Sequence, residues 1–488
     1  MTCLNEHQLI KQFPDRRSKQ LLLKGLWGIE RETQRTTEIG YISELPHPIS
    51  FGNKLTNKQI TVDFSENQLE FVTAPHPSPE LALRELAEIQ AYAETEIGDE
   101  LLWPFSMPPR LPDEEDIPIA VFPETDEGIQ KEIYRRGLAL RYGKRLQMIS
   151  GIHYNFSFSQ ELIQYLYLRS GASSSFVTFS NNLYLRVSRQ FIKHRWLLIY
   201  LFGASPVADS SYDSEMQKKL NYQCDLKVEK EKFNKYATSL RASRYGYSNE
   251  VEACYQVSYN HLADYQKDVK RLLATPSAHF AKLGMMRNGK QVQLNYNIIQ
   301  NESEFYAPIR IKQKVKGGKT QLDAIMKRGI GYLEIRTLDI DPFDRYGIQR
   351  DTIHFVHLFL LYCLLINDEQ LTEKQQSLAN ENHEYIALFG RKPTLKLTLA
   401  NNSAILAQDW AKQILNEMFK LADFLDTEAG FYQSIVRGQL EKVVNYSLLP
   451  SQRIADELAA YPNSYLEFGI DLAKLHQTGH SGWCREIQ

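Results

Sequence analysis

The stretch Gly28-Ile29-Glu30-Arg31-Glu32-Thr33 decides the fold that we predict for this chain. Its residues alternate in character, and successive side chains of an extended strand point to opposite faces. Glu30 and Glu32 therefore share one face, whereas Ile29 lies on the other. Two carboxylates so close together repel each other unless a cation lies between them. The stretch predicts a strand that begins a metal-binding face, which later strands complete.

Several later stretches alternate in the same way and place polar residues on one face. These stretches are 60–64 (Asp63), 69–73 (Glu70), 151–158 (His153, Asn155), 292–299 (Asn295, Asn297) and 332–338 (Glu334, Arg336). One such strand is most often explained by a solvated face, but several that supply acids, amides and a histidine favour a shared site. Carboxylate oxygens with one imidazole suit Mg²⁺ or Mn²⁺, which neutralise phosphate charge in phosphoryl transfer.

Strands and helices follow one another in an irregular order, which predicts an α+β fold with a mainly antiparallel sheet. Helical spacing is expected over the ranges 5–24, 79–97, 133–148 and 183–202, and over nearly all of the chain after 348. The basic segment Lys312–Thr320 is typical of a hairpin tip, and Asp209–Lys235 of an exposed excursion. One domain over 1–488 is expected, with about 1–345 carrying the sheet and the site and about 346–488 mainly helical.

The composition excludes several classes of protein. The 488 residues are 43% hydrophobic and 24% charged, which is ordinary for a globular protein. The net charge of −2 argues against binding to nucleic acid or to a membrane surface through a basic patch. The five cysteines have no C-x-x-C spacing, so neither a zinc site nor a disulfide framework is indicated, and a cytoplasmic location is expected.

No glycine-rich phosphate loop is present in the sequence. Gly317-Gly318-Lys319-Thr320 resembles the end of such a loop, but Gln313 stands where the first glycine is required. A nucleotide bound by this chain would therefore have its phosphates held by metal ions and arginines.

Eight blocks of sequence carry a more specific signal, and they run in one order over the first three-quarters of the chain. They are Gly28–Thr33, Asp63–Phe71, Trp103–Pro108, Ser150–Ser157, Tyr200–Pro206, Tyr236–Arg241, Glu304–Arg310 and Glu334–Arg336. Together they resemble bacterial glutamate–cysteine ligase of the proteobacterial type. No ATP-grasp region follows, so the bifunctional glutathione-making enzymes are not matched.

The resemblance implies a fold and a reaction. The fold is that of the glutamine synthetase catalytic domain, a curved antiparallel sheet with helices on its convex side and metals and ATP on its concave face. In the implied reaction, Mg²⁺ (or Mn²⁺) and ATP phosphorylate the γ-carboxylate of L-glutamate, and the amine of L-cysteine attacks the acyl phosphate. The products are γ-glutamylcysteine, ADP and phosphate, as in the first step of glutathione biosynthesis. A monomer is expected, without a nucleic-acid or membrane partner.

The resemblance also implies roles for individual residues. The implied metal ligands are Glu30, Glu32, Asp63, Glu70, His153 and Glu334. The implied stabilisers of the phosphoryl group are Arg135 and Arg336, and Arg310 is implied to contact ATP. The implied glutamate site consists of Arg241, Asn155, Gln147 and Ile149. The implied cysteine site consists of Phe64, Tyr134, Leu138, Tyr247 and Tyr306.

Three alternatives stay open at this point. A related carboxylate–amine ligase would use a different amine acceptor. A catalytically inactive binding protein on the same fold would be expected to lack some of the acids, yet every expected acid is present. Without the resemblance, the adjacent Arg135 and Arg136 are equal candidates for the site.

Overall fold

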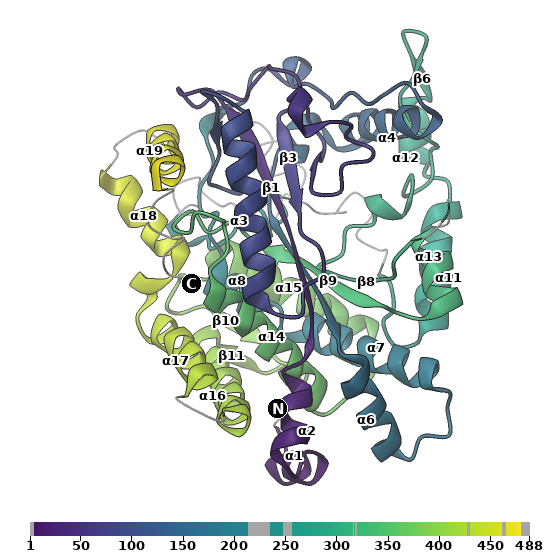
Figure 1. Cartoon of the computed structure of the whole chain (residues 1–488), viewed down its shortest axis with the longest axis vertical. Helices are drawn as coiled ribbons and strands as arrows, with labels where there is room; N and C mark the ends of the chain where they lie inside the picture. Colours follow the sequence, from purple (N-terminus) through teal and green to yellow (C-terminus); the bar gives the residue numbers. More distant parts are fainter. Residues whose placement is uncertain are drawn as a thin grey trace.

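The fold is organised around a seven-stranded antiparallel sheet. The structure is a computed structural model, and it describes residues 4–212, 235–246, 256–315, 317, 320–426, 430–460 and 465–479. The strand order is β2-β3-β1-β5-β9-β8, and β4 pairs with one end of β1. Figure 1 shows the long strand β1 in purple beside helix α3. The mainly antiparallel α+β fold expected from the sequence is confirmed.

The strands of the sheet are β1 (Gly25–Thr36), β2 (Ile60–Val62), β3 (Gln68–Val72), β4 (Leu101–Leu102), β5 (Ile152–Phe158), β8 (Ile309–Lys312) and β9 (Tyr332–Leu338). Two small hairpins lie apart from it, β6 (Met286–Arg287) with β7 (Lys290–Gln291), and β10 (Lys396–Thr398) with β11 (Ala404–Leu406).

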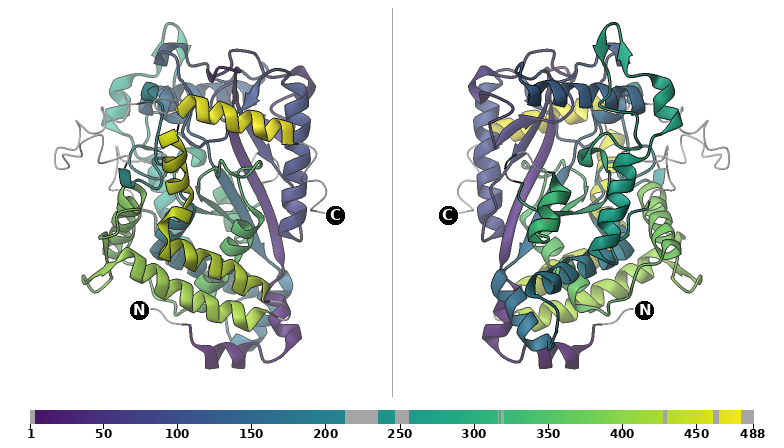
Figure 2. Two further views of the ribbon diagram at one scale, coloured as in Figure 1. Left: turned by 90° about the vertical axis from the view of Figure 1, so that its left-hand side faces the viewer. Right: turned by 90° about the vertical axis from the view of Figure 1, so that its right-hand side faces the viewer.

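The helices that precede β8 are α1 (Glu6–Gln12), α2 (Arg16–Leu22), α3 (Pro79–Glu96), α4 (Asp126–Tyr142), α5 (Lys144–Gln147), α6 (Gln160–Ser170), α7 (Phe176–His194), α8 (Trp196–Phe202), α11 (Leu262–Ala274) and α12 (Ala278–Leu283). Those that follow β8 are α13 (Gln321–Arg328), α14 (Arg350–Leu365), α15 (Glu373–Phe389), α16 (Ala407–Leu425), α17 (Phe431–Val444), α18 (Pro450–Ala460) and α19 (Tyr465–Thr478). The expected helical C-terminal part is confirmed, and its helices α16 to α19 lie on the opposite side of the molecule from α11 and α13 (Figures 1 and 2).

The apolar face of the sheet packs against α3, α7 and α14. Trp27 of β1 and Phe156 of β5 both contact the ring of His357 on α14, with ring centroids 5.1 and 5.0 Å away. Helix α14 is apolar on every side, which is typical of a helix buried in the middle of a protein. Helix α3 begins as its sequence predicts, because Ser78 caps it and Pro79 occupies its first turn. This packing leaves the other face of the sheet free to carry polar groups.

Three predictions from the sequence are wrong in detail. The range 292–299 is a loop rather than a strand, because the Asn295 and Asn297 side chains bond to backbone groups and so replace the hydrogen bonds of a ladder. The segment Lys312–Thr320 is not a hairpin tip, since α13 stands between β8 and β9. The helix expected over 183–202 is two helices, which meet at Arg195.

No helix in the described ranges combines the length and the apolar character needed to cross a bilayer. Most of the expected excursion Asp209–Lys235 lies outside the described residues.

Candidate active site

A cleft of about 940 Å³ lies on the polar face of the sheet. Its floor is formed by side chains of β1, β3, β5, β8 and β9, and its walls by α4 and the loop that carries Asn301 to Tyr306. All six predicted metal ligands and both predicted phosphoryl-binding arginines line it. The strands that the sequence pattern identified therefore do converge on one site.

Strand register explains why these side chains meet. Glu32 of β1 lies directly opposite Glu70 of β3, and Glu30 lies opposite His153 of β5. Residues paired in this way on neighbouring antiparallel strands hold their side chains on the same face of the sheet. Asn155, further along β5, lies opposite Glu334 of β9. The alternation within each strand and the pairing between strands thus select the same set of polar residues.

Glu30, Glu70 and His153 form the group best placed to hold a metal ion. Each offers a ligand atom within 4.8 Å of those of the other two. Glu30 is fixed by two hydrogen bonds, one at 2.9 Å with Nδ1 of His153 and one at 2.8 Å from the side-chain amide of Asn155. Oxygen ligands with one imidazole match the preference of a hard divalent cation.

Repulsion among these carboxylates has a large effect on the pKa of Glu70. Burial raises the pKa of Glu70 well above its usual value, and the charges of Glu30, Asp63 and Glu32 raise it further. Burial also raises the pKa of Glu30, but the hydrogen bond with His153 and the charges of His153 and Lys312 together outweigh it, so the net pKa shift of Glu30 is downward. A cation between these two carboxylates would relieve the repulsion on Glu70, so the residues present fit a divalent metal ion.

Glu334 lies in a basic environment instead. One of its oxygens is 2.7 Å from Nζ of Lys312 and the other is 2.7 Å from Nη1 of Arg336. Although burial opposes ionisation, Lys312, Arg336 and Arg310 together hold the pKa of Glu334 well below its usual value. A metal ion bound to Glu334 would have to share this carboxylate with two cations.

The structure distinguishes the two neighbouring arginines of α4. Arg135 lines the cleft, and its guanidinium donates to the backbone carbonyls of Asp63 and Val62. Arg136 pairs with Glu132 at 2.6 Å and is not among the residues that line the cleft. Arg135 is therefore the one of the two that is available to the site.

The remaining predicted residues divide into three groups. Those that line the cleft are Phe64, Tyr134, Leu138, Tyr306, Gln147 and Arg310. Those that lie near it without lining it are Asn155, Ile149 and Arg241. Tyr247 lies outside the described residues.

Arg241 is buried behind the floor of the cleft, with 1% of its surface exposed. Its Nη2 donates to the backbone carbonyl of Arg336 at 2.9 Å, and its Nη1 lies 3.7 Å from Oδ1 of Asp339 in a buried ion pair. Neither Nε nor Nη1 has a hydrogen-bond partner. Gly151 covers it, and a Cβ at that position would lie 2.0 Å from Nη2 of Arg241. A buried guanidinium whose Nε and Nη1 lack hydrogen bonds is costly even beside Asp339, which supports a binding role.

Lys312 and Glu304 are among the cleft residues that the sequence reasoning missed as site residues. Lys312 was interpreted as part of a solvated turn, yet its ammonium group is bound to Glu334. Glu304 was quoted in a motif without a role, yet it lines the cleft and is 5% exposed. Lys312 had a usable signal, since Ile309-Arg310-Ile311-Lys312 alternates as the other strands do. Glu304 had none, because its side-chain partners Arg141 and Tyr142 lie far away in the sequence.

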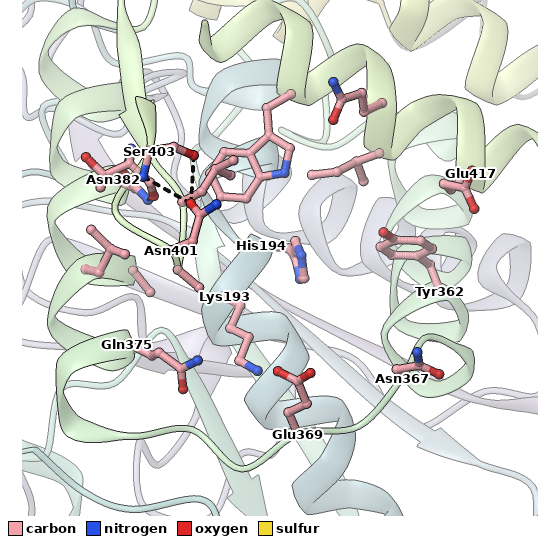
Figure 3. Close-up of a pocket in the computed structure, with 18 of the residues that line it drawn as sticks. Lys193, His194, Tyr362, Asn367, Glu369, Gln375, Asn382, Asn401, Ser403 and Glu417 are labelled. Atoms are coloured by element: carbon pink, nitrogen blue, oxygen red, sulfur yellow. Dashed lines mark hydrogen bonds between the residues drawn. The ribbon is translucent and has the colours of Figure 1, made fainter. Parts of the chain in front are cut away.

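A second cavity, of about 620 Å³, lies between α7, α14, α15 and α16 (Figure 3). Its wall includes several side-chain amides and the rings of Tyr362 and Trp410, and its only charged lining residues among those described are Lys193, Glu369 and Glu417. It therefore lacks the clustered cations and acids that a nucleotide–metal complex needs, and the cleft on the sheet is the better candidate.

Comparison with known proteins agrees with this choice. The family described as glutamate–cysteine ligase matches residues 10–386. A glutamate–cysteine ligase of Clostridium acetobutylicum is 43% identical over 479 residues, which cover 96% of this chain and 98% of that protein. A glutamate–cysteine ligase of Shewanella oneidensis is 37% identical over 472 residues, which cover 96% of this chain and 89% of that protein.

Two solved structures are also similar. The glutamate–cysteine ligase of Francisella tularensis in complex with AMP has a TM-score of 0.85 and 34% identity, and the match covers 95% of this chain and 90% of that one. A bifunctional glutathione synthetase of Pasteurella multocida has a TM-score of 0.75 and 28% identity, and the match covers 96% of this chain and 54% of that one.

Proposed function

Since the chain belongs to the glutamate–cysteine ligase family, it catalyses the ATP-dependent synthesis of γ-glutamylcysteine, and we propose that two halves of its cleft divide this work. The acidic half holds the metal ions, and the basic half binds the transferring phosphoryl group. The observation that carries this proposal is that Glu30, Glu70 and His153 lie on the same sheet face as Lys312, Arg310 and Arg336.

The metal proposed for the acidic half is Mg²⁺, with Mn²⁺ as a substitute. Glu30, Glu70 and His153 would hold one ion, with Glu32, Asp63 and Glu334 available to further ions. Bound magnesium would neutralise the charge of the ATP phosphates and polarise the transferring group. The raised pKa of Glu70 supports this proposal, because it marks the place where positive charge is needed most.

The basic half is proposed to stabilise the phosphoryl group as it moves to the γ-carboxylate of L-glutamate. Arg336 and Arg135 line the cleft from opposite sides of the metal group, on β9 and α4. Fixed cations aimed at developing charge provide much of the rate gain in such reactions. Arg310, with Nη1 4.0 Å from Glu334, is proposed to contact the nucleotide phosphates.

Arg241 is proposed to bind the α-carboxylate of L-glutamate, with Asn155, Gln147 and Ile149 beside it. The guanidinium fork matches a carboxylate, and two of its nitrogens have no other hydrogen-bond partner. We expect Arg241→Ala to raise the KM for glutamate roughly 10- to 100-fold, as loss of charge-assisted hydrogen bonds implies. Steady-state kinetics with each substrate varied in turn would check this. A change confined to the KM for ATP would contradict the assignment, and Arg241→Lys provides a charge-conserving control.

The cysteine side chain is proposed to occupy a pocket formed by Phe64, Tyr134, Leu138 and Tyr306, all of which line the cleft. Tyr247 completes the proposed set. Aromatic rings suit a small polarizable thiol. The test of the whole reaction is ADP release with glutamate, ATP, Mg²⁺ and either cysteine, 2-aminobutyrate, alanine or ammonia. Turnover that does not depend on cysteine would contradict the choice of acceptor.

The remaining proposals concern organisation. We propose that residues 1–488 form one ligase domain that acts as a cytoplasmic monomer, and sedimentation analysis would test the oligomeric state. The cytoplasmic location is proposed because the five cysteines of the sequence have no C-x-x-C spacing and indicate no disulfide framework.

A further inference from the structure

Glu304 is the centre of a buried polar network at the edge of the cleft. Its Oε1 accepts hydrogen bonds from Nη1 of Arg141 at 2.9 Å and from the hydroxyl of Tyr142 at 2.8 Å. Its Oε2 accepts from the backbone N–H of Gln300 at 2.7 Å. The ion pair with Arg141 is almost completely buried, at 0% and 1% side-chain exposure. One carboxylate oxygen of Glu304 therefore joins its loop to Arg141 and Tyr142, and the other closes a bond within that loop.

The two elements joined by this network are helix α4 and the loop 293–306. Arg141, besides its bond to Glu304, donates to the side chain of Gln293 at 3.0 Å and to the backbone carbonyl of Asn295 at 2.6 Å. Gln300 returns from the loop to α4, where its side-chain amide donates to the carbonyl of Tyr134 at 3.3 Å. The helix and the loop are thus held together at several points along one contact.

Gly137 permits the close approach of the two elements. A Cβ at this position of α4 would lie 2.0 Å from the side-chain oxygen of Gln300. That oxygen accepts the backbone N–H of Leu294 at 3.0 Å, so Gln300 cannot move aside without breaking a loop hydrogen bond. The distance between α4 and the loop is therefore set by the absence of a side chain at position 137.

The same helix and loop form the two walls of the proposed cysteine pocket. Tyr134 and Leu138 come from α4, and Tyr306 follows Glu304 by two residues. We propose that Glu304 is a positioning residue that sets the width of the acceptor pocket and so its selectivity for cysteine over other amines. This proposal rests on the proposed function, because it requires that these three residues contact the acceptor.

The physical argument is one of rigidity. A hydrophobic pocket discriminates between acceptors that differ by one small group only if its walls cannot move apart. Glu304 exerts no direct selection on the acceptor, but its bonds to Arg141 and Tyr142 hold the wall bearing Tyr306 against the wall bearing Leu138. Its bond to the backbone of Gln300 makes the loop itself more rigid. Ground-state positioning of this kind is measured in the KM for the acceptor rather than in kcat.

The test uses two variants that loosen the contact in different ways. The partners of Glu304, namely Arg141, Tyr142 and the backbone N–H of Gln300, all donate hydrogen bonds to it. In Glu304→Gln one acceptor oxygen is replaced by an NH₂ group, which is itself a donor, so at least one of these bonds is lost. Gly137→Ala displaces Gln300 without changing any charge, and alanine also favours the helix. We expect each variant to raise the KM for cysteine about tenfold and to lower the preference for cysteine over 2-aminobutyrate by a similar factor. The KM values for ATP and glutamate, and kcat at saturating cysteine, should stay within about twofold.

Two control variants distinguish a wrong assignment of the cysteine pocket from a wrong assignment of the positioning role of Glu304. Glu100→Gln disrupts another buried ion pair, with Arg35 at 2.6 Å, and should lower the melting temperature without changing acceptor preference. Leu138→Ala tests the pocket itself, and unchanged acceptor kinetics in that variant would refute the proposed pocket. If Leu138→Ala alters acceptor preference but Glu304→Gln and Gly137→Ala do not, or if they shift all three KM values together, the positioning role of Glu304 is refuted.

Discussion

Glu30→Gln and Glu70→Gln should each abolish turnover but shift the stability of the protein in opposite directions. Both substitutions remove a proposed metal ligand from the group formed with His153. We expect kcat to fall by roughly 10³-fold in each variant, since charge stabilisation in the cleft is lost. Mn²⁺ binding, followed by calorimetry with each purified variant, should weaken in parallel with activity.

The difference in stability follows from the two pKa shifts. The pKa of Glu30 is lowered, so its ionised form stabilises the fold at any pH above the pKa of the unfolded chain, and glutamine loses this contribution. The pKa of Glu70 is raised, so its ionisation costs stability as the pH rises, and glutamine removes that cost. In EDTA at pH 8 we expect Glu30→Gln to lose about 1–2 kcal/mol, as for a charge-assisted hydrogen bond, and Glu70→Gln to melt at or above the temperature of the parent protein.

This contrast differs from what repulsion between carboxylates alone would give, since repulsion alone would make Glu30→Gln stabilising without metal. The two hydrogen bonds that Glu30 receives from His153 and Asn155 compensate its burial, whereas Glu70 is surrounded by three other carboxylates. A large fall in melting temperature for Glu70→Gln would show that Glu70 is structural. Thermal melts at pH 6 and pH 8 would check the sign, because the advantage of Glu70→Gln should grow with pH.

Arg336→Met is the second substitution for which we expect a large loss of catalytic activity. Arg336 carries a fixed charge at the cleft, since Glu334 raises its pKa against the opposing effect of burial. An arginine that stabilises a transferring phosphoryl group contributes about 10³-fold or more to the rate. We expect kcat and kcat/KM for ATP to fall together by about that factor, which is typical of an interaction made only in the transition state. Single-turnover measurement of ADP formation would separate this effect from product release.

Two further variants test whether the loss of rate is due to the guanidinium of Arg336 in particular. Arg336→Lys keeps the charge but not the fork, so it should recover part of the rate. Arg136→Met removes an arginine that is paired with Glu132 outside the cleft, and it should leave the rate unchanged. A fall of less than tenfold in Arg336→Met would assign the phosphoryl group to Arg135 instead.

Much of this site could be predicted from the sequence because β-strands have a strict period of two. Glu30, Glu70, His153 and Glu334 were assigned to one face by alternation alone, and the register confirms that they converge. The same alternation led to a wrong prediction of a strand at Asn295 and Asn297, which lie in a loop where their side-chain amides bond to backbone groups. Alternation indicates a strand only where the backbone hydrogen bonds are made by another strand, and the sequence does not show that partner.

The sequence by itself determined the chemistry of this protein, because the strand Gly28–Thr33 carries two acids on one face, which predicts a metal site, and the ordered blocks identify the ligase family. Only the tertiary structure decided how charge is distributed among those acids. Glu334 is paired with Lys312, Glu70 bears the repulsion, and Glu304 joins α4 to the loop 293–306. The physical reason is that pKa values and buried ion pairs depend on distances between residues far apart in the chain, which the pattern within any one strand does not contain.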